Sequence, residues 1–348
     1  MKVNKFKTHE LEKCYSICPL TYHGTEHMLV AAEKVNKCLL FDLDGNLEET
    51  VWEEPGGVMT MVQVPGSDGE FLATHKFYSP NDSKEAKIIL ASPKGKDDWE
   101  IKTLVDLPFV HRFDVLTSGG VNYLIACALK SGHDYKEDWT QPGKIWVGEL
   151  PEDLSAVNEN NPLKLTALKE GLLKNHGYCR VTEQDGVWAA VAADNGIFKV
   201  VPPAQRGGEW TVETLVEDAA SDMTLVDFDG DGELEMLVMT PFHGDTVKIY
   251  KKVDGVYTCI HTFDKKYEFL HGIWGEEIYG KGIALIGHRK SERDLYACYY
   301  DGEKYVLELL DSNIGPANIR CYNKDGKVRF VSTNREIDEI AFYEIESL

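Results

Sequence analysis

Residues 176–218 read HGYCRVTEQDGVWAAVAADNGIFKVVPPAQRGGEWTVETLVED and contain four short apolar runs separated by turn-forming residues. The runs HGYCRVTE, VWAAVAAD, GIFKVVPP and WTVETLVED are rich in valine, isoleucine and aromatic residues, which favour β-strands. The first gap carries Asp-Gly and the second carries Asn-Gly, the dipeptides typical of tight hairpins. This stretch therefore predicts four antiparallel strands joined by short turns.

The same order of four runs recurs along the chain. Residues 221–264 repeat it as DMTLVDFD, ELEMLVMT, TVKIYKKV and YTCIHTFD. The last unit has only three runs, ANIRCYN, VRFVSTN and EIAFYEI, and the amino-terminal VNKFKTHEL resembles the outer strand that it lacks. The units span approximately residues 14–54, 55–107, 108–174, 175–218, 219–264, 265–311, and 312–348 together with 3–12.

Seven such units predict an all-β fold, a single seven-bladed β-propeller of four-stranded antiparallel blades. The amino-terminal strand joins the last blade, and this closure removes the exposed edges of a long array of strands. Two stacked β-sandwiches are the alternative, but they do not account for a last unit that is short by the one strand that the first segment supplies.

Composition narrows the functional classes. The chain has 348 residues, 43% of them hydrophobic, and it contains no apolar run long enough to span a membrane. Its amino terminus, MKVNKFKTHELEK, lacks the apolar stretch of a secretory signal, so we expect a cytoplasmic protein. The net charge of −21 disfavours nucleic acid and membrane surfaces as partners. Eight cysteines fall singly in apolar runs without a CxxC pair, which indicates buried reduced thiols.

The stretch DFDGDGELE has the spacing of a calcium-binding loop. Asp227, Asp229, Asp231 and Glu235 occupy positions 1, 3, 5 and 9, and Gly232 lies at position 6. Alternating oxygen ligands around a sharp bend suit calcium, so one structural calcium ion could bind there. The alternative is a metal-free hairpin turn, because turns favour Asp and Gly for their own backbone geometry.

Histidines concentrate on one predicted face of the propeller. The start of strand one and the loop after strand two lie on the same face of each blade, opposite the turn between strands one and two. The starts of strand one place His111, His176 and His271 there, and the loops after strand two place His75, His133, His243 and His288 there. Convergent imidazoles suit proton transfer and metal binding, so this face predicts a functional site. The same rule adds Lys76, Arg112, Asp134, Asp194, Asp222, Asp245, Arg289, Lys290, Asn318 and Arg335 to the face.

The words around these histidines resemble a known family. FVHRFDVL, HDYKEDWTQPGKIWVGELP, GLLKNHGYCRV, DFDGDGELEMLVMTPFHGDTVKIYKK and EFLHGIW are similar, in matching order, to the propeller of aldos-2-ulose dehydratase and related sugar lyases. The similarity covers approximately residues 108–300, and the acidic turn also resembles FG-GAP (VCBS-type) propeller repeats. The chain lacks the second propeller and the cupin domain of the fungal enzyme.

The resemblance implies a dehydration or β-elimination on a small keto-sugar or uronic sugar. Elimination beside a carbonyl needs a base for the C–H proton, an electrophile for the enolate and an acid for the departing oxygen. We expect His176 or His243 as base or acid, Arg112 and Arg289 as partners of an oxyanion or carboxylate, and Asp245 as the orienter of an imidazole. His111, His271 and His288 are the expected ligands of a divalent metal: zinc, manganese or magnesium.

Six further residues are expected to bind substrate. This set comprises His75, His133, Asp134, Trp139, Trp274 and Lys290. Trp139 and Trp274 could form an apolar floor for a sugar ring, although Trp274 equally fits packing between blades.

Two other functions fit the same features. An isomerase or epimerase, or a lyase that cleaves a disaccharide, would use the same enolate chemistry. A non-catalytic propeller that binds a sugar or a protein is the alternative from another class. The chain has no GxSxG motif and no GxGxxG or P-loop, so we expect neither a serine nucleophile nor a nucleotide cofactor.

Overall fold

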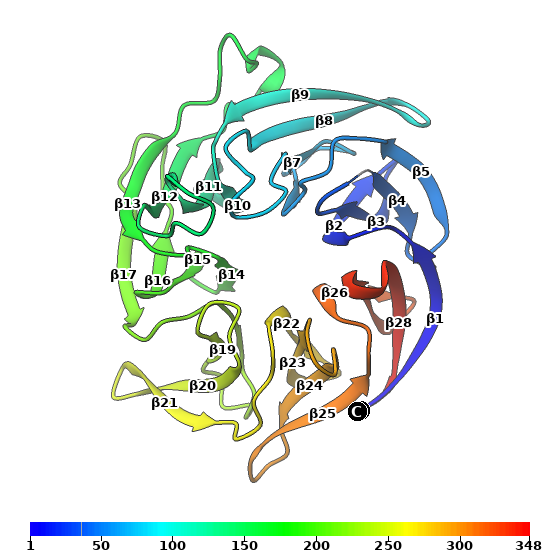
Figure 1. The fold of residues 1–348 in the computed structure, drawn as a ribbon, viewed down its shortest axis with the longest axis vertical. Coiled ribbons are helices and arrows are strands. Elements are labelled where there is room, and N and C mark those ends of the chain that lie inside the picture. The colour runs from blue at the N-terminus through cyan, green and yellow to red at the C-terminus, as the bar shows by residue number, and fades with distance from the viewer. Residues whose placement is uncertain (36) are drawn as a thin grey trace.

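The computed structural model of the protein describes residues 1–35 and 37–348. Within these residues, 28 strands form seven antiparallel sheets of four strands each, arranged around a common axis (Figure 1). The predicted seven-bladed propeller is confirmed. No helix in this part of the chain is long and apolar enough to cross a membrane.

The first four blades follow one another along the chain. Blade 1 comprises β2 (Cys14–Tyr22), β3 (Thr25–Ala32), β4 (Cys38–Asp42) and β5 (Leu47–Trp52). Blade 2 comprises β6 (Met61–Gln63), β7 (Phe71–His75), β8 (Lys87–Gly95) and β9 (Asp98–Asp106). Blade 3 comprises β10 (Val110–Ser118), β11 (Val121–Lys130), β12 (Pro142–Glu149) and β13 (Thr166–Leu172). Blade 4 comprises β14 (Gly177–Glu183), β15 (Gly186–Ala193), β16 (Gly196–Val201) and β17 (Thr211–Val216).

The remaining blades continue in the same way, and the last one closes the ring. Blade 5 comprises β18 (Asp222–Val226), β19 (Glu235–Thr240), β20 (Thr246–Val253) and β21 (Val256–Thr262). Blade 6 comprises β22 (Leu270–Ile278), β23 (Lys281–His288), β24 (Leu295–Tyr300) and β25 (Tyr305–Asp311). Blade 7 comprises β26 (Pro316–Lys324), β27 (Lys327–Asn334), β28 (Glu339–Ser347) and β1 (Lys2–Glu10). Two 3-10 helices, η1 (Leu154–Ala156) and η2 (Arg335–Ile337), lie in connecting segments.

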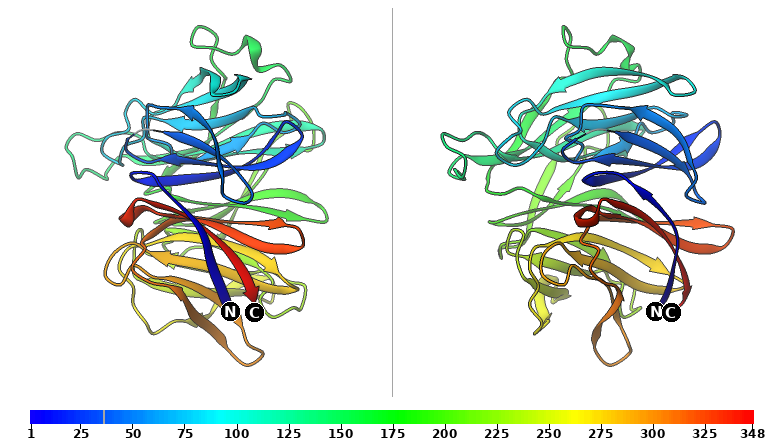
Figure 2. Two further views of the ribbon diagram at one scale, coloured as in Figure 1. Left: turned by 90° about the vertical axis from the view of Figure 1, so that its right-hand side faces the viewer. Right: turned by 45° about the vertical axis from the view of Figure 1, so that its right-hand side comes forward.

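Closure joins the two ends of the chain. β1 pairs antiparallel with β28, from Lys2 opposite Ser347 to Glu10 opposite Glu339. The two termini therefore lie side by side (Figure 2). This pairing confirms that the amino-terminal segment supplies the missing outer strand.

Burial explains which runs are apolar. The second strand of each blade is covered on both faces by the neighbouring blades, so β15 and β19 are nearly continuous apolar runs. The outer strand β17 is mostly exposed and alternates threonine, valine and glutamate. The core consists of contacts between adjacent blades, such as Trp52 against Phe71 with ring centroids 5.9 Å apart. All eight cysteines are free thiols; six are buried as predicted, whereas Cys179 on β14 is partly exposed and Cys259 on β21 is exposed.

Candidate metal centre

Six of the seven blades begin at the axis with the same local geometry. Each blade has an equivalent residue within two positions of the start of its innermost strand, called here the lead-in residue. In blade order these are Tyr15, Met59, His111, His176, Ser221, His271 and Ala317. Two positions before it, six blades have a residue with left-handed backbone: Lys13, Gly57, Phe109, Lys174, Phe269 and Gly315. The chain therefore turns sharply just before it enters the innermost strand. The fifth blade, which leads to Ser221, is the exception within the described chain.

A β-bulge sets the lead-in residue apart from the ladder in four blades. The register with the second strand shifts across Tyr15, His111, His271 and Ala317. A bulge leaves one residue unpaired and re-aims its side chain. The repeated fold thus presents seven equivalent positions near the axis, and histidine occupies three of them.

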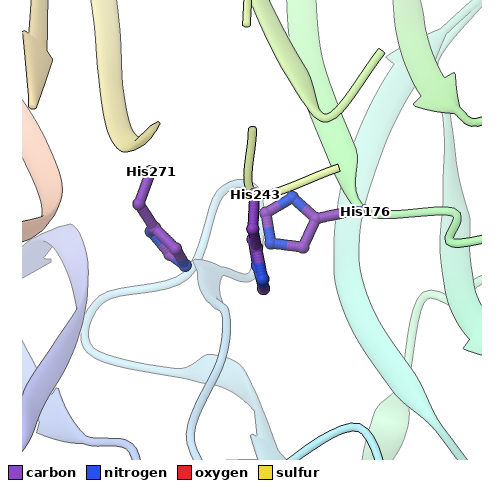
Figure 3. Close-up of side chains that lie close together, drawn as sticks. All are labelled: His176, His243 and His271. Atoms are coloured by element: carbon purple, nitrogen blue, oxygen red, sulfur yellow. The ribbon is translucent and has the colours of Figure 1, made fainter. Parts of the chain in front are cut away.

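His243 completes the group from a different element. It belongs to the loop between β19 and β20 in blade 5, whose own lead-in residue is the small Ser221. The Ser221 hydroxyl accepts a hydrogen bond from the His243 backbone N–H at 3.1 Å, which ties the loop to the lead-in residue of its own blade. His176, His243 and His271 come together in this way, with one ligand atom of each within 4.8 Å of the others (Figure 3). These three residues are called the histidine triad below.

Backbone carbonyls orient two of the three imidazoles. His176 Nδ1 lies 3.1 Å from the carbonyl oxygen of Ser221, and His271 Nδ1 lies 2.8 Å from that of Ala317. Each carbonyl belongs to the lead-in residue of the next blade. Because a carbonyl only accepts, Nδ1 must carry the proton and Nε2 must carry the lone pair. A histidine that ligates a metal through Nε2 has this arrangement.

Aromatic stacking holds the third imidazole. His243 lies between the rings of Phe242 and Phe269, with centroids 3.9 and 4.3 Å away and interplanar angles of 24° and 27°. Its Nε2 is buried without a hydrogen-bond partner, and so is that of His176. The Nε2 of His271 lies 3.1 Å from the Tyr15 hydroxyl. Of the three Nε2 atoms of the triad, only that of His271 therefore has a hydrogen-bond partner among the described residues.

Burial keeps these imidazoles neutral. Desolvation, followed by the charge of Arg112, lowers the pKa of His176 to about 3. Desolvation also lowers the pKa of His243 and His271 well below the usual range, with further effects of Arg289 and of neighbouring imidazoles. A metal ligand must be neutral imidazole, so the triad is in the protonation state that binds a cation at neutral pH. The triad could hold a metal ion.

Polar groups surround the triad. The His111 ring lies 4.4 Å from the His176 ring, and its buried Nδ1 has no partner. Arg112 donates to the Met59 carbonyl and to Asn318 Oδ1, both at 3.2 Å. Its guanidinium also lies 4.0 Å from the Asp222 carboxylate. Burial raises the pKa of Asp222 to about 6, although the charge of Arg112 opposes this rise.

A second arginine approaches from blade 6. Arg289 pairs with Glu336 through Nε at 2.9 Å and Nη2 at 2.8 Å. Its guanidinium carbon lies 5.0 Å from the centre of the Phe269 ring, which stacks on His243. Lys290 also lies over Phe269, 5.3 Å from the ring centre. Positive charge therefore flanks the triad from two sides.

The structure separates other predicted residues from the triad. His288 uses both ring nitrogens on the backbone, with Nδ1 2.8 Å from the Lys290 carbonyl and Nε2 accepting from Asp294 N–H at 3.2 Å. Asp245 accepts from the Thr246 hydroxyl at 2.6 Å and lies 3.6 Å from Lys266. Within the described chain no hydrogen bond joins Asp245 to an imidazole; backbone carbonyls orient His176 and His271, and aromatic stacking holds His243.

Some of the predicted substrate-binding residues lie in a loop near the lead-in residues, and others pack elsewhere in the blades. Trp139 contacts Phe242 edge to face at 5.4 Å, and His133 lies 5.9 Å from Phe109, so both belong to loops near the lead-in residues. Asp134 lies in the same loop as His133 and accepts from Gln141 at 3.3 Å. His75 packs edge to face against Trp52 at 4.8 Å, and Trp274 lies three residues beyond His271, beneath the guanidinium of Arg320.

Sequence reasoning missed Tyr15, Phe242 and Phe269. Alignment of the repeat units places Tyr15 of CYSIC at the same position as the histidine of HGYC and LHGIW. That alignment would have revealed Tyr15 as a member of the site. The stacking phenylalanines had no comparable signal, because their contacts with His243 come from two different blades.

The acidic turn between β18 and β19 forms a second group that could hold a cation. One carboxylate oxygen of each of Asp227, Asp229 and Glu235 lies within 4.8 Å of the others. The Lys251 ammonium lies against this turn, 2.6 Å from Asp229 and 2.8 Å from Glu235. It is also 2.6 Å from Asp231. A cation from the protein itself thus occupies the place where the spacing predicts calcium.

Comparison with known proteins assigns no family. No model of a known protein family matches the chain, and no curated protein matches it significantly. The structure shows the propeller fold, and the resemblance to sugar dehydratases stays a prediction.

Proposed function

We propose that the protein is a metal-assisted carbon–oxygen lyase that dehydrates a small keto-sugar or uronic sugar. The observation that supports this most is the histidine triad, with two buried imidazoles tied through Nδ1 and three ligand atoms within 4.8 Å. Imidazole nitrogens suit zinc, whereas magnesium prefers oxygen ligands, so the donor set favours zinc over magnesium. The resemblance described above supplies the substrate class.

A bound divalent metal would polarise the substrate carbonyl and lower the pKa of the adjacent C–H. The lone pairs of His176 and His243 are then engaged, so the base must be another group. His111 is the nearest candidate, because its unpartnered Nδ1 belongs to a ring 4.4 Å from His176. Arg112 and Arg289 supply positive charge for the enolate or for a substrate carboxylate.

Tyr15 is the candidate acid. Burial raises the pKa of its hydroxyl to about 12, so it keeps its proton at neutral pH. The hydroxyl lies 3.1 Å from His271 Nε2, and it would be free to donate elsewhere if that lone pair held a metal. His111 would take the C–H proton while Tyr15 protonates the departing hydroxyl as water, and transfer of the proton from His111 to Tyr15 restores both. The product is the unsaturated sugar plus water.

The test pairs two histidines at left-handed backbone positions. His243→Asn removes a triad member at φ 48°, and His23→Asn alters an exposed histidine at φ 51°. Asparagine tolerates this conformation, so the two variants carry the same backbone cost. Zinc would be measured by mass spectrometry after dialysis, and unsaturated product by ultraviolet absorbance with keto-sugars and uronic sugars.

We expect about one equivalent of zinc and product formation in wild type and His23→Asn, and loss of both in His243→Asn. His111→Gln should keep the zinc and lose the product, which separates metal binding from proton transfer. Equal zinc retention by wild type and His243→Asn would overturn the metal centre. A zinc-loaded wild type without unsaturated product from either sugar class would overturn the lyase.

A further inference from the structure

A second polar cluster lies on the axis, further along the innermost strands than the triad. Its members are Asp114 on β10, Arg180 on β14, Trp274 on β22 and Arg320 on β26, each three or four residues beyond a lead-in residue. These innermost strands face one another across the centre of the ring (Figure 1). Four different blades therefore contribute to the cluster, which is called the axial cluster below.

Asp114 fixes Arg180 in place. Arg180 Nε donates to Asp114 Oδ2 at 2.8 Å, and Nη2 donates to the same carboxylate and to the Val115 carbonyl at 3.1 Å. The Tyr178 hydroxyl donates to Asp114 at 2.9 Å, which further fixes the carboxylate. The Arg180 side chain is nevertheless 46% exposed, so solvent reaches this part of the axis.

Arg320 is held differently, by an aromatic ring rather than by a carboxylate. Its guanidinium carbon lies over Trp274, 3.9 Å from the ring centre. Within residues 1–35 and 37–348, no carboxylate forms an ion pair with it, and its buried Nε has no hydrogen-bond partner. Glu276, one of two acidic residues on the same strand as Trp274, accepts a hydrogen bond from the Trp274 indole N–H at 3.0 Å.

This arrangement is costly without a ligand. A buried N–H that lacks an acceptor loses its hydration without compensation, and the cost is larger when the group is charged. Burial lowers the pKa of Arg320, although the nearby charge of Glu276 opposes this effect. By contrast, Arg112 and Arg289 are each paired with a carboxylate. An arginine that is positioned by an aromatic ring, with its donors left free, is typical of oxyanion recognition.

We propose that Arg320, with Arg180, binds a small oxyanion on the axis, a carboxylate or a phosphate. A planar guanidinium matches either group with two parallel hydrogen bonds. Trp274 keeps the guanidinium plane fixed, so little side-chain entropy is lost on binding. The site uses none of the triad residues and does not depend on the proposed lyase activity.

The test replaces the unpaired arginine and a paired one. Arg320→Met removes the charge and keeps the length of the chain, and Arg206→Met does the same at an exposed site where Arg206 pairs with Glu149 at 3.2 Å. Titration calorimetry with sodium phosphate and, separately, sodium malonate would be run at constant ionic strength in chloride. Each titration would be repeated on the EDTA-treated His243→Asn protein.

We expect saturable binding of one anion to wild type, Arg206→Met and the EDTA-treated His243→Asn protein. Arg320→Met should weaken this binding at least tenfold while melting no lower than wild type in chloride. Binding of phosphate alone would assign a phosphate site, and binding of malonate alone a carboxylate site. Undiminished anion binding by Arg320→Met, or no saturable binding of either anion to wild type, would overturn the proposal.

Discussion

Lys251→Met removes the ammonium group that lies among the carboxylates of the acidic turn. Its Nζ lies 2.6 Å from Asp229, 2.6 Å from Asp231 and 2.8 Å from Glu235. The Glu235 side chain is fully buried, and its pKa is raised, chiefly by burial. Burial opposes the charge of Lys251, but hydrogen bonds with the three carboxylates outweigh it and raise its pKa. The folded protein therefore depends on this cation to neutralise three acids.

The expected cost follows from burial. Removing one partner of a fully buried ion pair costs about 3–5 kcal/mol. Asp229 and Asp231 are 24% and 47% exposed, so water screens part of their repulsion. We expect Lys251→Met to lower the free energy of unfolding by about 2–4 kcal/mol. The variant should also gain a calcium response, because the carboxylates then have the spacing of a calcium loop without a competing ammonium.

Urea denaturation followed by circular dichroism measures both effects. Wild type, Lys251→Met and the exposed neighbouring variant Lys252→Met would be compared in EGTA and in calcium. Free calcium at a hundred times its dissociation constant should restore about 2.7 kcal/mol to Lys251→Met and leave the other two proteins unchanged. A wild type that is strongly stabilised by calcium, or a Lys251→Met protein as stable as wild type in EGTA, would refute the reasoning.

Two further predictions concern stability. Burial, followed by the charges of Lys87 and Lys76, lowers the pKa of His75 to about 3, below the value of about 6.5 expected in the unfolded chain. Protons therefore bind the unfolded chain first, and stability present above pH 6.5 is lost as pH falls toward 3; at pH 5.0 the loss is about 2 kcal/mol. The urea midpoint should fall less between pH 7.5 and pH 5.0 in His75→Phe than in wild type. An equal fall in the two proteins would contradict this prediction. Gly57→Ala would place a Cβ 2.3 Å from the backbone nitrogen of Phe77 at φ 79°, whereas Gly66→Ala at φ 80° meets nothing within 4 Å. Both variants carry left-handed strain of about 1–2 kcal/mol, so thermal melting should be lower for Gly57→Ala, and equal melting temperatures would exclude the clash.

The amino-acid sequence by itself determined the architecture of this protein. Turn dipeptides and apolar runs act over a few residues, so four-strand units can be recognised locally, and VNKFKTHEL could be matched to the strand missing from the last unit. The concentration of histidines at strand starts and loops was also readable, because position within the repeat predicts the face of the propeller.

Only the tertiary structure decided which histidines meet. His271 and His288 lie at the same open end of the hairpin formed by β22 and β23, where Leu270 pairs with His288, yet His271 joins the triad while His288 bonds to its own loop. The position of His271 depends on a bulge in its strand and on the Ala317 carbonyl of the next blade, which lies far from His271 in the chain. Lys251 likewise reaches the acidic turn from β20, twenty residues after Asp231. Repeat patterns predict position along each blade, but contacts between blades require the whole closed ring.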